Sequence, residues 1–461
     1  MTPEITIKEY GLGGVFNGIQ IDVVVVKKQT SEGCTESPLC DHNCVKEVDG
    51  RPTGGKYNCP AAFTLNKGTR PDTLASKEEI IHGIKNVAEG IERSKKYFLG
   101  KFFDEYSSEF DLPPHFAEAL RTNLGAGGVE INLFGGNPEM HPDIAAIVAE
   151  LKQLGYIINL TTTGRRLMHD QKFVEDISAN PPHLLALSAD EFDSPETIKK
   201  YAQMSLEEIK KEWQTVPPFF GQRQKMLEAI YATKLLHGRV KILYNIAVHP
   251  GNIVNIYQLI DALKNNLPGV LINPYPAQSS FLYEPAVFAE EQMSELEKFV
   301  QYMIGEQVGQ MGQTIKIFVP RLHYWLMLKS IFNTYQDKKR MATALSGYGV
   351  WQCFRRPGSG RYIQIGLSTL PNDKPTAGGY FGCFWNNQTV TDSSEQVWNM
   401  NNEQIDDYLI AGPTKLAARC TRPCPGCIMP RLNFDLLGVE KGMNLELKNN
   451  YLKLRKEYIG F

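Results

Sequence analysis

The stretch "IQIDVVVVKKQTSEGCTESPLCDHNC", residues 19–44, joins an apolar run to a polar loop that carries three cysteines. The first eight residues are rich in Val and Ile and are bounded by Gly18 and by two lysines, which is typical of a buried β-strand. Three thiols in a loop directly after a strand are consistent with a disulfide, a zinc site or a site for a reactive group. The rest of the sequence indicates which of these three kinds of site is present.

The overall composition narrows the choice. Lys and Arg total 49 against 51 for Asp and Glu in 461 residues, so the net charge is −2 and no broad basic surface for nucleic acid is expected. No signal peptide and no apolar run of about 20 residues is recognisable, which favours a cytoplasmic protein without a transmembrane segment. In that reducing compartment, clustered cysteines are more typical of metal ligands or catalytic thiols than of disulfides.

The region after the cysteine loop alternates strand-like and helix-like segments. Ser76 and Glu79 form a predicted capping box ahead of a helix, and Gly155 is the predicted C-cap of another. Apolar runs predict six strands in total: 19–26, 128–134, 156–162, 183–188, 240–248 and 269–273. Such alternation predicts an α/β fold with a parallel sheet and right-handed crossovers, either open or closed into a full or partial barrel.

Polar residues follow each predicted strand. In a parallel sheet the carboxyl ends of the strands share one edge, where ligands bind. The sequences at these ends are "FGGNPE" (134–139), "TTTG" (161–164), "SAD" (188–190), Asn245 with Asn252, and "NPYP" (273–276). Each taken alone is more typical of turns and helix caps, but together, beside three cysteines, they predict a site.

The order of these motifs resembles that of the radical S-adenosylmethionine (SAM) enzymes over most of residues 19–275. Those enzymes have a three-cysteine loop after the first strand, a Gly-Gly-Glu type motif after the second and a Ser-x-Asp type element after the fourth. The resemblance implies a partial (β/α)6 TIM-like barrel with a cysteine-rich C-terminal extension. It also implies a [4Fe–4S] cluster with SAM as cofactors, reductive cleavage of SAM to a 5′-deoxyadenosyl radical, and hydrogen abstraction from a substrate.

The same resemblance assigns the site residues. The cluster ligands would be Cys34, Cys40 and Cys44, although the C-x5-C-x3-C spacing is wider than the family's usual C-x3-C-x2-C and Cys59 is an alternative ligand. The implied SAM contacts are His42 for adenine, Gly135, Gly136, Asn137 or Glu139 for the methionine ammonium, Thr162, and Ser188, Asp190 and Asn245 for ribose or carboxylate. Glu139 has a plain surface role as its alternative reading.

Five further cysteines lie near the C-terminal end, in an arrangement similar to the SPASM or twitch extensions of these enzymes. They are Cys353, Cys383, Cys420, Cys424 and Cys427. A subset would hold one auxiliary [4Fe–4S] cluster, with a structural zinc as the alternative. The expected domains are a barrel at 1–310 with an insertion at about 95–125, a helical linker at 311–345, and a cluster domain with a C-terminal helix at 346–461.

Enzymes of this type modify peptides or maturate proteins, so the resemblance implies a peptide or protein substrate and a reductant such as flavodoxin or ferredoxin. A small-molecule or lipid substrate is the alternative within the same chemistry. A non-catalytic iron–sulfur electron-transfer or assembly scaffold and a zinc-stabilised α/β binding protein are alternatives of other classes.

Overall fold

A computed structural model describes the barrel strands, their helices and several elements of the C-terminal third. The described residues are 20–26, 42–43, 46–48, 51–53, 57–58, 76–97, 129–135, 137–188, 194–216, 221–248, 251–276, 289–309, 322–334, 362–366, 380–383, 386–389, 401–404 and 445–459.

The main sheet has nine strands in the order β10-β9-β8-β7-β6-β1-β11-β12-β13. Six of them are the predicted strands, namely β1 (Gln20–Val26), β6 (Glu130–Gly135), β7 (Ile157–Thr162), β8 (Leu184–Ser188), β9 (Lys241–Val248) and β10 (Val270–Pro276). All five pairings among them are parallel.

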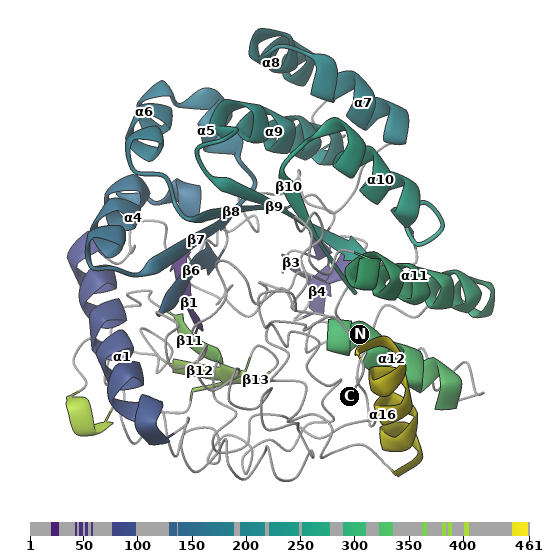
Figure 1. The fold of residues 1–461 in the computed structure, drawn as a ribbon. Helices are drawn as coiled ribbons and strands as arrows, with labels where there is room; N and C mark the ends of the chain where they lie inside the picture. Colours follow the sequence, from purple (N-terminus) through teal and green to yellow (C-terminus); the bar gives the residue numbers. More distant parts are fainter. Residues whose placement is uncertain are drawn as a thin grey trace.

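The strand order identifies the architecture. Each strand of this set lies beside the next one of the set along the chain, so the order never reverses as it does in a doubly wound sheet. Crossovers of one hand then put all connecting helices on the same face. Figure 1 shows those helices on the outside of an arc of strands. The α/β class and the partial (β/α)6 barrel are therefore confirmed.

Helices follow most of these strands. They are α1 (Lys77–Tyr97), the 3-10 turn η4 (Pro138–Met140), α4 (Ile144–Gln153), α5 (Arg165–His169), α6 (Gln171–Ala179), α7 (Pro195–Gln203), α8 (Leu206–Thr215), α9 (Gly221–Leu236) and α10 (Ile256–Asn266). The main core lies between these helices and the outward side chains of the strands, such as Ile131, Leu133 and Tyr244.

Local sequence signals explain where helices begin and end. The predicted capping box before α1 is confirmed, because the Ser76 N–H donates to Glu79 Oε2 at 2.7 Å and the Glu79 N–H donates to Ser76 Oγ at 3.2 Å. Gly155 follows α4 with φ +86°, a left-handed conformation that suits glycine after a helix. The pair α7 and α8 was not expected from the sequence.

The sheet continues beyond β1 into the C-terminal third of the chain. β11 (Tyr362–Gly366) pairs in parallel with β1, Gln20 opposite Tyr362. β12 (Tyr380–Cys383) and β13 (Asn386–Thr389) follow in antiparallel order. The strand-like "RYIQIG" of the sequence thus joins the barrel sheet directly.

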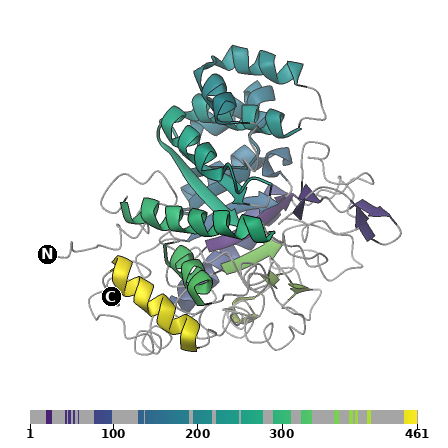
Figure 2. The ribbon, with the colours of Figure 1, turned by 90° about the vertical axis from the view of Figure 1, so that its right-hand side faces the viewer.

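Three further helices pack beside the barrel: α11 (Glu290–Gly309), α12 (Leu322–Thr334) and α16 (Leu445–Ile459). The helix α12 is largely apolar, and its Trp325 and Leu328 are fully buried, which is typical of a helix packed in a core. Figure 2 shows α16 lying against α12. Among the described helices none has the length and apolar character needed to cross a membrane.

Candidate functional site

The strands present different side chains on their two faces. Leu184, Ala186 and Leu243 form a small apolar cluster separate from the main core, with Leu271 packed against it. Because alternate residues of a strand point to opposite faces, this cluster marks the inner face of the arc. Continuing the same alternation toward the carboxyl ends leads to polar residues: Ser188 on β8, Asn245 on β9 and Asn273 on β10.

Polar side chains also occupy the inner face of β6 and β7. Thr161 Oγ1 donates to Asn132 Oδ1 at 3.0 Å, and the Asn159 amide donates to the carboxylate of Glu130. In a closed eight-stranded barrel this space is filled by bulky branched side chains. The inner face is therefore built with hydrogen-bonding groups at positions where such barrels pack hydrocarbon.

At the carboxyl ends of β6 and β7, Asn137 connects two loops through side-chain hydrogen bonds. Its Oδ1 accepts from Thr162 Oγ1 at 2.8 Å and from the Glu139 N–H at 3.3 Å, and its Nδ2 donates to Thr163 Oγ1 at 3.1 Å. The side chain is 1% exposed. Asn137 thus fixes the two loops against each other, while its predicted contact with a ligand stays a prediction.

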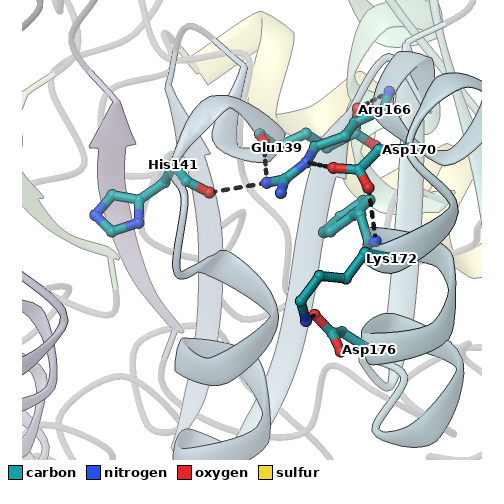
Figure 3. Close-up of polar contacts among 7 residues, drawn as sticks. Glu139, His141, Arg166, Asp170, Lys172 and Asp176 are labelled. Atoms are coloured by element: carbon teal, nitrogen blue, oxygen red, sulfur yellow. Dashed lines mark hydrogen bonds and ion pairs between the residues drawn. The ribbon is translucent and has the colours of Figure 1, made fainter.

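Glu139 is fully buried, so its alternative reading as a surface residue is wrong. Its Oε2 accepts from the backbone N–H of Arg166 at 2.9 Å, in the first turn of α5. The Arg166 side chain returns the contact, donating through Nη1 to the carbonyl oxygens of Glu139 at 2.9 Å and His141 at 3.1 Å (Figure 3). The Glu139 carboxylate, which lies in the loop after β6, therefore caps α5.

Asp170 extends this contact to the next helix. It accepts from Arg166 Nε at 2.9 Å and from the backbone N–H of Phe173 at 3.0 Å, as the N-cap of α6. The Phe173 N–H and the Arg166 guanidinium together hold the pKa of the Asp170 carboxyl below its usual value. The guanidinium also lies 4.4 Å above the Phe173 ring. The loops that carry Asn137 and Thr162 are thus clamped to two helices.

Gly164 closes the loop after β7 in a conformation that only glycine adopts without strain. Its φ is +85°, and a Cβ at this position would lie 3.1 Å from Ala232 Cβ, 3.2 Å from the Glu228 carbonyl oxygen and 3.3 Å from Leu187 Cδ2. The glycine lets the loop approach α9 closely.

On the opposite side of the arc, three polar residues lie at the rim on neighbouring strands: Ser188, Asn245 and Asn273. The first two are predicted site residues. Ser188 pairs with Asn245 along β8 and β9, and Asn245 pairs with Asn273 along β9 and β10. Asn273 Nδ2 donates to Asn245 Oδ1 at 2.6 Å. Asn273 is 8% exposed, and its Oδ1 has no hydrogen-bond partner among the described residues.

The predicted cluster ligands are mostly outside the described residues. This holds for Cys34, Cys40, Cys44, Cys59, Cys353, Cys420, Cys424 and Cys427, and for Gly136 and Asp190. Gly135 ends β6, Cys383 ends β12, and His42 lies in the short strand β2 (His42–Asn43), which pairs with β5 (Tyr57–Asn58). Nearby, β3 (Lys46–Val48) and β4 (Arg51–Thr53) form a hairpin. Within the described part of the chain, no group of three His, Cys, Asp or Glu side chains gathers to hold a metal.

Two contributors were missed by sequence reasoning. The spacing of Arg166 to Asp170 was its only local signal, because its other partners lie in a loop 25 to 27 residues earlier in the chain. The polar inner face did give a signal in the sequence, because polar residues occupy alternate positions of two predicted strands: Glu130, Asn132, Asn159 and Thr161.

No family model matches the sequence, and a comparison with curated proteins finds no match either. The fold is similar to that of several solved structures. The crystal structure of Streptococcus suis SuiB bound to the precursor peptide SuiA has 12% identity and a TM-score of 0.47, over 93% of this chain and 72% of that one. SuiB bound to S-adenosylmethionine has 13% identity and a TM-score of 0.45, over 88% and 68%. Native anSMEcpe with bound AdoMet has 11% identity and a TM-score of 0.43, over 96% of each chain.

Proposed function

We propose that this protein is a radical SAM enzyme that abstracts hydrogen from a peptide or protein substrate. One observation carries the proposal. A three-cysteine loop follows β1, the first strand of a singly wound parallel barrel, so it starts at the rim where the carboxyl ends of the other strands lie. Parallel strands place ligand sites at that rim.

The donor groups fit the cofactors. Three thiolates can hold a [4Fe–4S] cluster while leaving one iron open to an exogenous ligand. The rim also provides uncharged hydrogen-bonding groups. Among them is the oxygen of buried Asn273, which has no partner among the described residues and could accept from a bound molecule. When bound there, the cluster would supply one electron to cleave the sulfonium of SAM into methionine and a 5′-deoxyadenosyl radical, which takes hydrogen from the substrate.

The residues of the chain would bind and orient. Gly135 and Gly136 let the methionine part approach the backbone after β6, with Asn137 and Glu139 beside it. Thr162, Ser188, Asp190 and Asn245 would contact the ribose or carboxylate, and His42 the adenine. The clamp of Glu139, Arg166 and Asp170 holds the β6 and β7 loops to α5 and α6. The contacts from these two loops would therefore be preorganised before ligand binds.

The C-terminal cysteines would hold one auxiliary [4Fe–4S] cluster, using a subset of Cys353, Cys383, Cys420, Cys424 and Cys427. The pairing of β11 with β1 supports a position of this region beside the barrel, because Cys383 ends a strand of the same sheet. A low-potential protein such as flavodoxin or ferredoxin would supply the electron. Cytoplasmic location and sensitivity to oxygen belong to the same proposal.

The test is anaerobic reconstitution with iron and sulfide, followed by dithionite, SAM and a search for 5′-deoxyadenosine. We expect iron–sulfur absorbance and deoxyadenosine formation in the wild type. Changing Cys34, Cys40 and Cys44 to Ala should abolish deoxyadenosine. Changing Cys353 or Cys383 to Ala should leave SAM cleavage measurable but stop substrate turnover.

Other outcomes select the alternatives. Clusters without SAM binding would favour an electron-transfer or assembly scaffold, and zinc without iron would overturn the proposal. Cys59→Ala tests the remaining ambiguity in the loop: if Cys59 is a ligand, this variant should lose the cluster and one of the three other cysteine variants should retain it.

A further inference from the structure

The amides of Asn245 and Asn273 form a pair at the inner rim, and the pairing limits what each can still do. A hydrogen bond of 2.6 Å joins them, with one NH2 as donor and one carbonyl oxygen as acceptor. The bond leaves the oxygen of the donating residue and the whole NH2 of the accepting residue without a partner inside the pair, besides the second N–H of the donating NH2. This count is the same if both amides are turned over, so it does not depend on how nitrogen and oxygen are assigned.

These remaining groups are directed to the inner face. Asn245 and Asn273 are paired in register and stand two residues beyond Leu243 and Leu271, which line that face. Among the described residues the Asn273 oxygen has no partner, although the side chain is 8% exposed. An unsatisfied buried carbonyl oxygen is costly unless a bound molecule donates to it.

We propose that Asn273 positions Asn245 and that the two amides together bind an uncharged ligand group carrying a hydrogen-bond donor beside an acceptor. An amide-type edge has this pattern, with a fixed donor and a fixed acceptor on neighbouring atoms. This inference rests on the proposed function, but it gives Asn245 a different contact from the ribose or carboxylate named there. Two molecules of that function carry such an edge. They are the aminopurine ring of SAM and an extended residue of a peptide substrate, whose own N–H and C=O lie on the same side of the chain.

The pattern explains why two amides are used. A pair of carboxylates would repel each other. Two hydroxyl groups could each either accept or donate, so they would not fix which ligand atom must donate. Two joined amides present one donor and one acceptor in fixed places, so a ligand edge with matching polarity is favoured over a charged one. Ser188, next in register on β8, offers a further hydroxyl beside the pair.

The test uses Asn273→Asp and Asn245→Asp in the full, reconstituted chain. Either change replaces an NH2 by an oxygen of nearly the same size and adds a negative charge. The remaining amide must then donate within the pair, so the NH2 that would face the ligand is lost and carboxylate and carbonyl oxygens take its place. Asn265→Asp is the matched control, because it is the same change at an exposed position on α10. Circular dichroism and iron content establish that each variant is folded and loaded. Asn245 is the less buried of the pair, so its variant serves if Asn273→Asp does not fold.

Two probes distinguish the sources of the edge: SAM, measured by equilibrium dialysis, and N-acetylglycinamide at millimolar concentration, measured by the shift in thermal midpoint. We expect each Asp variant to weaken binding of one probe by about tenfold while Asn265→Asp leaves it unchanged. A loss for SAM assigns the aminopurine, and a loss for the amide assigns the peptide. Unchanged binding of both probes in both variants overturns the inference. Absence of SAM binding in the wild type would instead count against the proposed function, and the amide probe still tests the pair.

Discussion

The carboxylate of Glu139 caps helix α5 through the backbone N–H of Arg166, and the Arg166 side chain in turn donates to the Glu139 carbonyl oxygen. The two residues belong to loops after different strands, β6 and β7. Their reciprocal contact therefore fixes the spacing of two rim loops, and Asn137 fixes it a second time.

Removing the Glu139 carboxylate should destabilise the barrel. Glu139→Ala leaves a partly buried N–H of α5 without its acceptor, so we expect the free energy of unfolding to fall by about 1–3 kcal/mol. Glu139→Gln keeps an oxygen acceptor and should lose less. Urea denaturation followed by far-UV circular dichroism measures both. Lys172→Ala is the control, since its ion pair with Asp176 is exposed and should contribute little (Figure 3). Equal losses in Glu139→Ala and the control would contradict the capping role.

The charge of Asp170 should make part of the stability depend on pH. Its pKa is lowered in the folded protein by the Phe173 N–H and by Arg166. The contribution is therefore complete above the ordinary aspartate pKa of about 3.9 and is lost as pH falls through the lowered value. Asp170→Asn keeps a capping side chain but has no charge. The urea midpoints of wild type and variant should differ at pH 7, and the difference should shrink as pH falls below about 3.9. A constant difference would argue against a role for the charge.

A methyl group at Gly164 should be tolerated less well than one at Gly155. Both glycines have positive φ, but a Cβ at Gly164 would lie 3.1 Å from Ala232 Cβ, whereas nothing lies within 4 Å at Gly155. Gly155→Ala thus measures the backbone strain of about 1–2 kcal/mol, and Gly164→Ala adds overpacking of roughly 1–3 kcal/mol. Thermal midpoints of the two variants give the comparison. Identical midpoints would show that the loop after β7 can move away from α9.

Helix α16 should be needed for the stability of the neighbouring helices. Tyr451 is buried. Two hydrogen bonds join α12 and α16: Ser330 Oγ donates to the Leu447 carbonyl oxygen at 3.2 Å, and Asn450 Nδ2 donates to Thr334 Oγ1 at 2.7 Å. Tyr451→Ala should cost about 3–5 kcal/mol, as for other large buried aromatic residues, while exposed Lys453→Ala should cost little. Hydrogen exchange should show faster exchange in α12 for Tyr451→Ala alone. Unchanged exchange there would mean that α12 is held by α11 without help.

Much of the barrel was predictable because its signals are local. Apolar runs of five to nine residues predicted all six strands, and the Ser76 and Glu79 pair predicted the start of α1. Helix α8 had an equally local signal that was overlooked, the capping box of Ser205 and Glu208. The polar pattern on β6 and β7 was also readable, since Glu130 and Asn132 alternate with buried Ile131 and Leu133.

The remaining site contacts join residues that are distant in sequence. Nothing in "TTTGRRL" indicates that the second arginine is the one held by Glu139, because that choice depends on how the two loops approach each other. The bond between Asn245 and Asn273 likewise depends on the register of two strands that a helix separates. Propensity and periodicity describe single elements and carry no information about such register.

The pairing of β11 with β1 also has a consequence for biosynthesis. During translation, β1 leaves the ribosome early, and one of its edges is covered by β6 once that strand is made. The other edge stays unpaired until Tyr362–Gly366 is synthesised, in the last quarter of the chain. Throughout that interval a Val-rich strand keeps one row of unpaired N–H and C=O groups, a template for association with other nascent chains. The protein should therefore depend on chaperones, and truncation before β11 should yield aggregates.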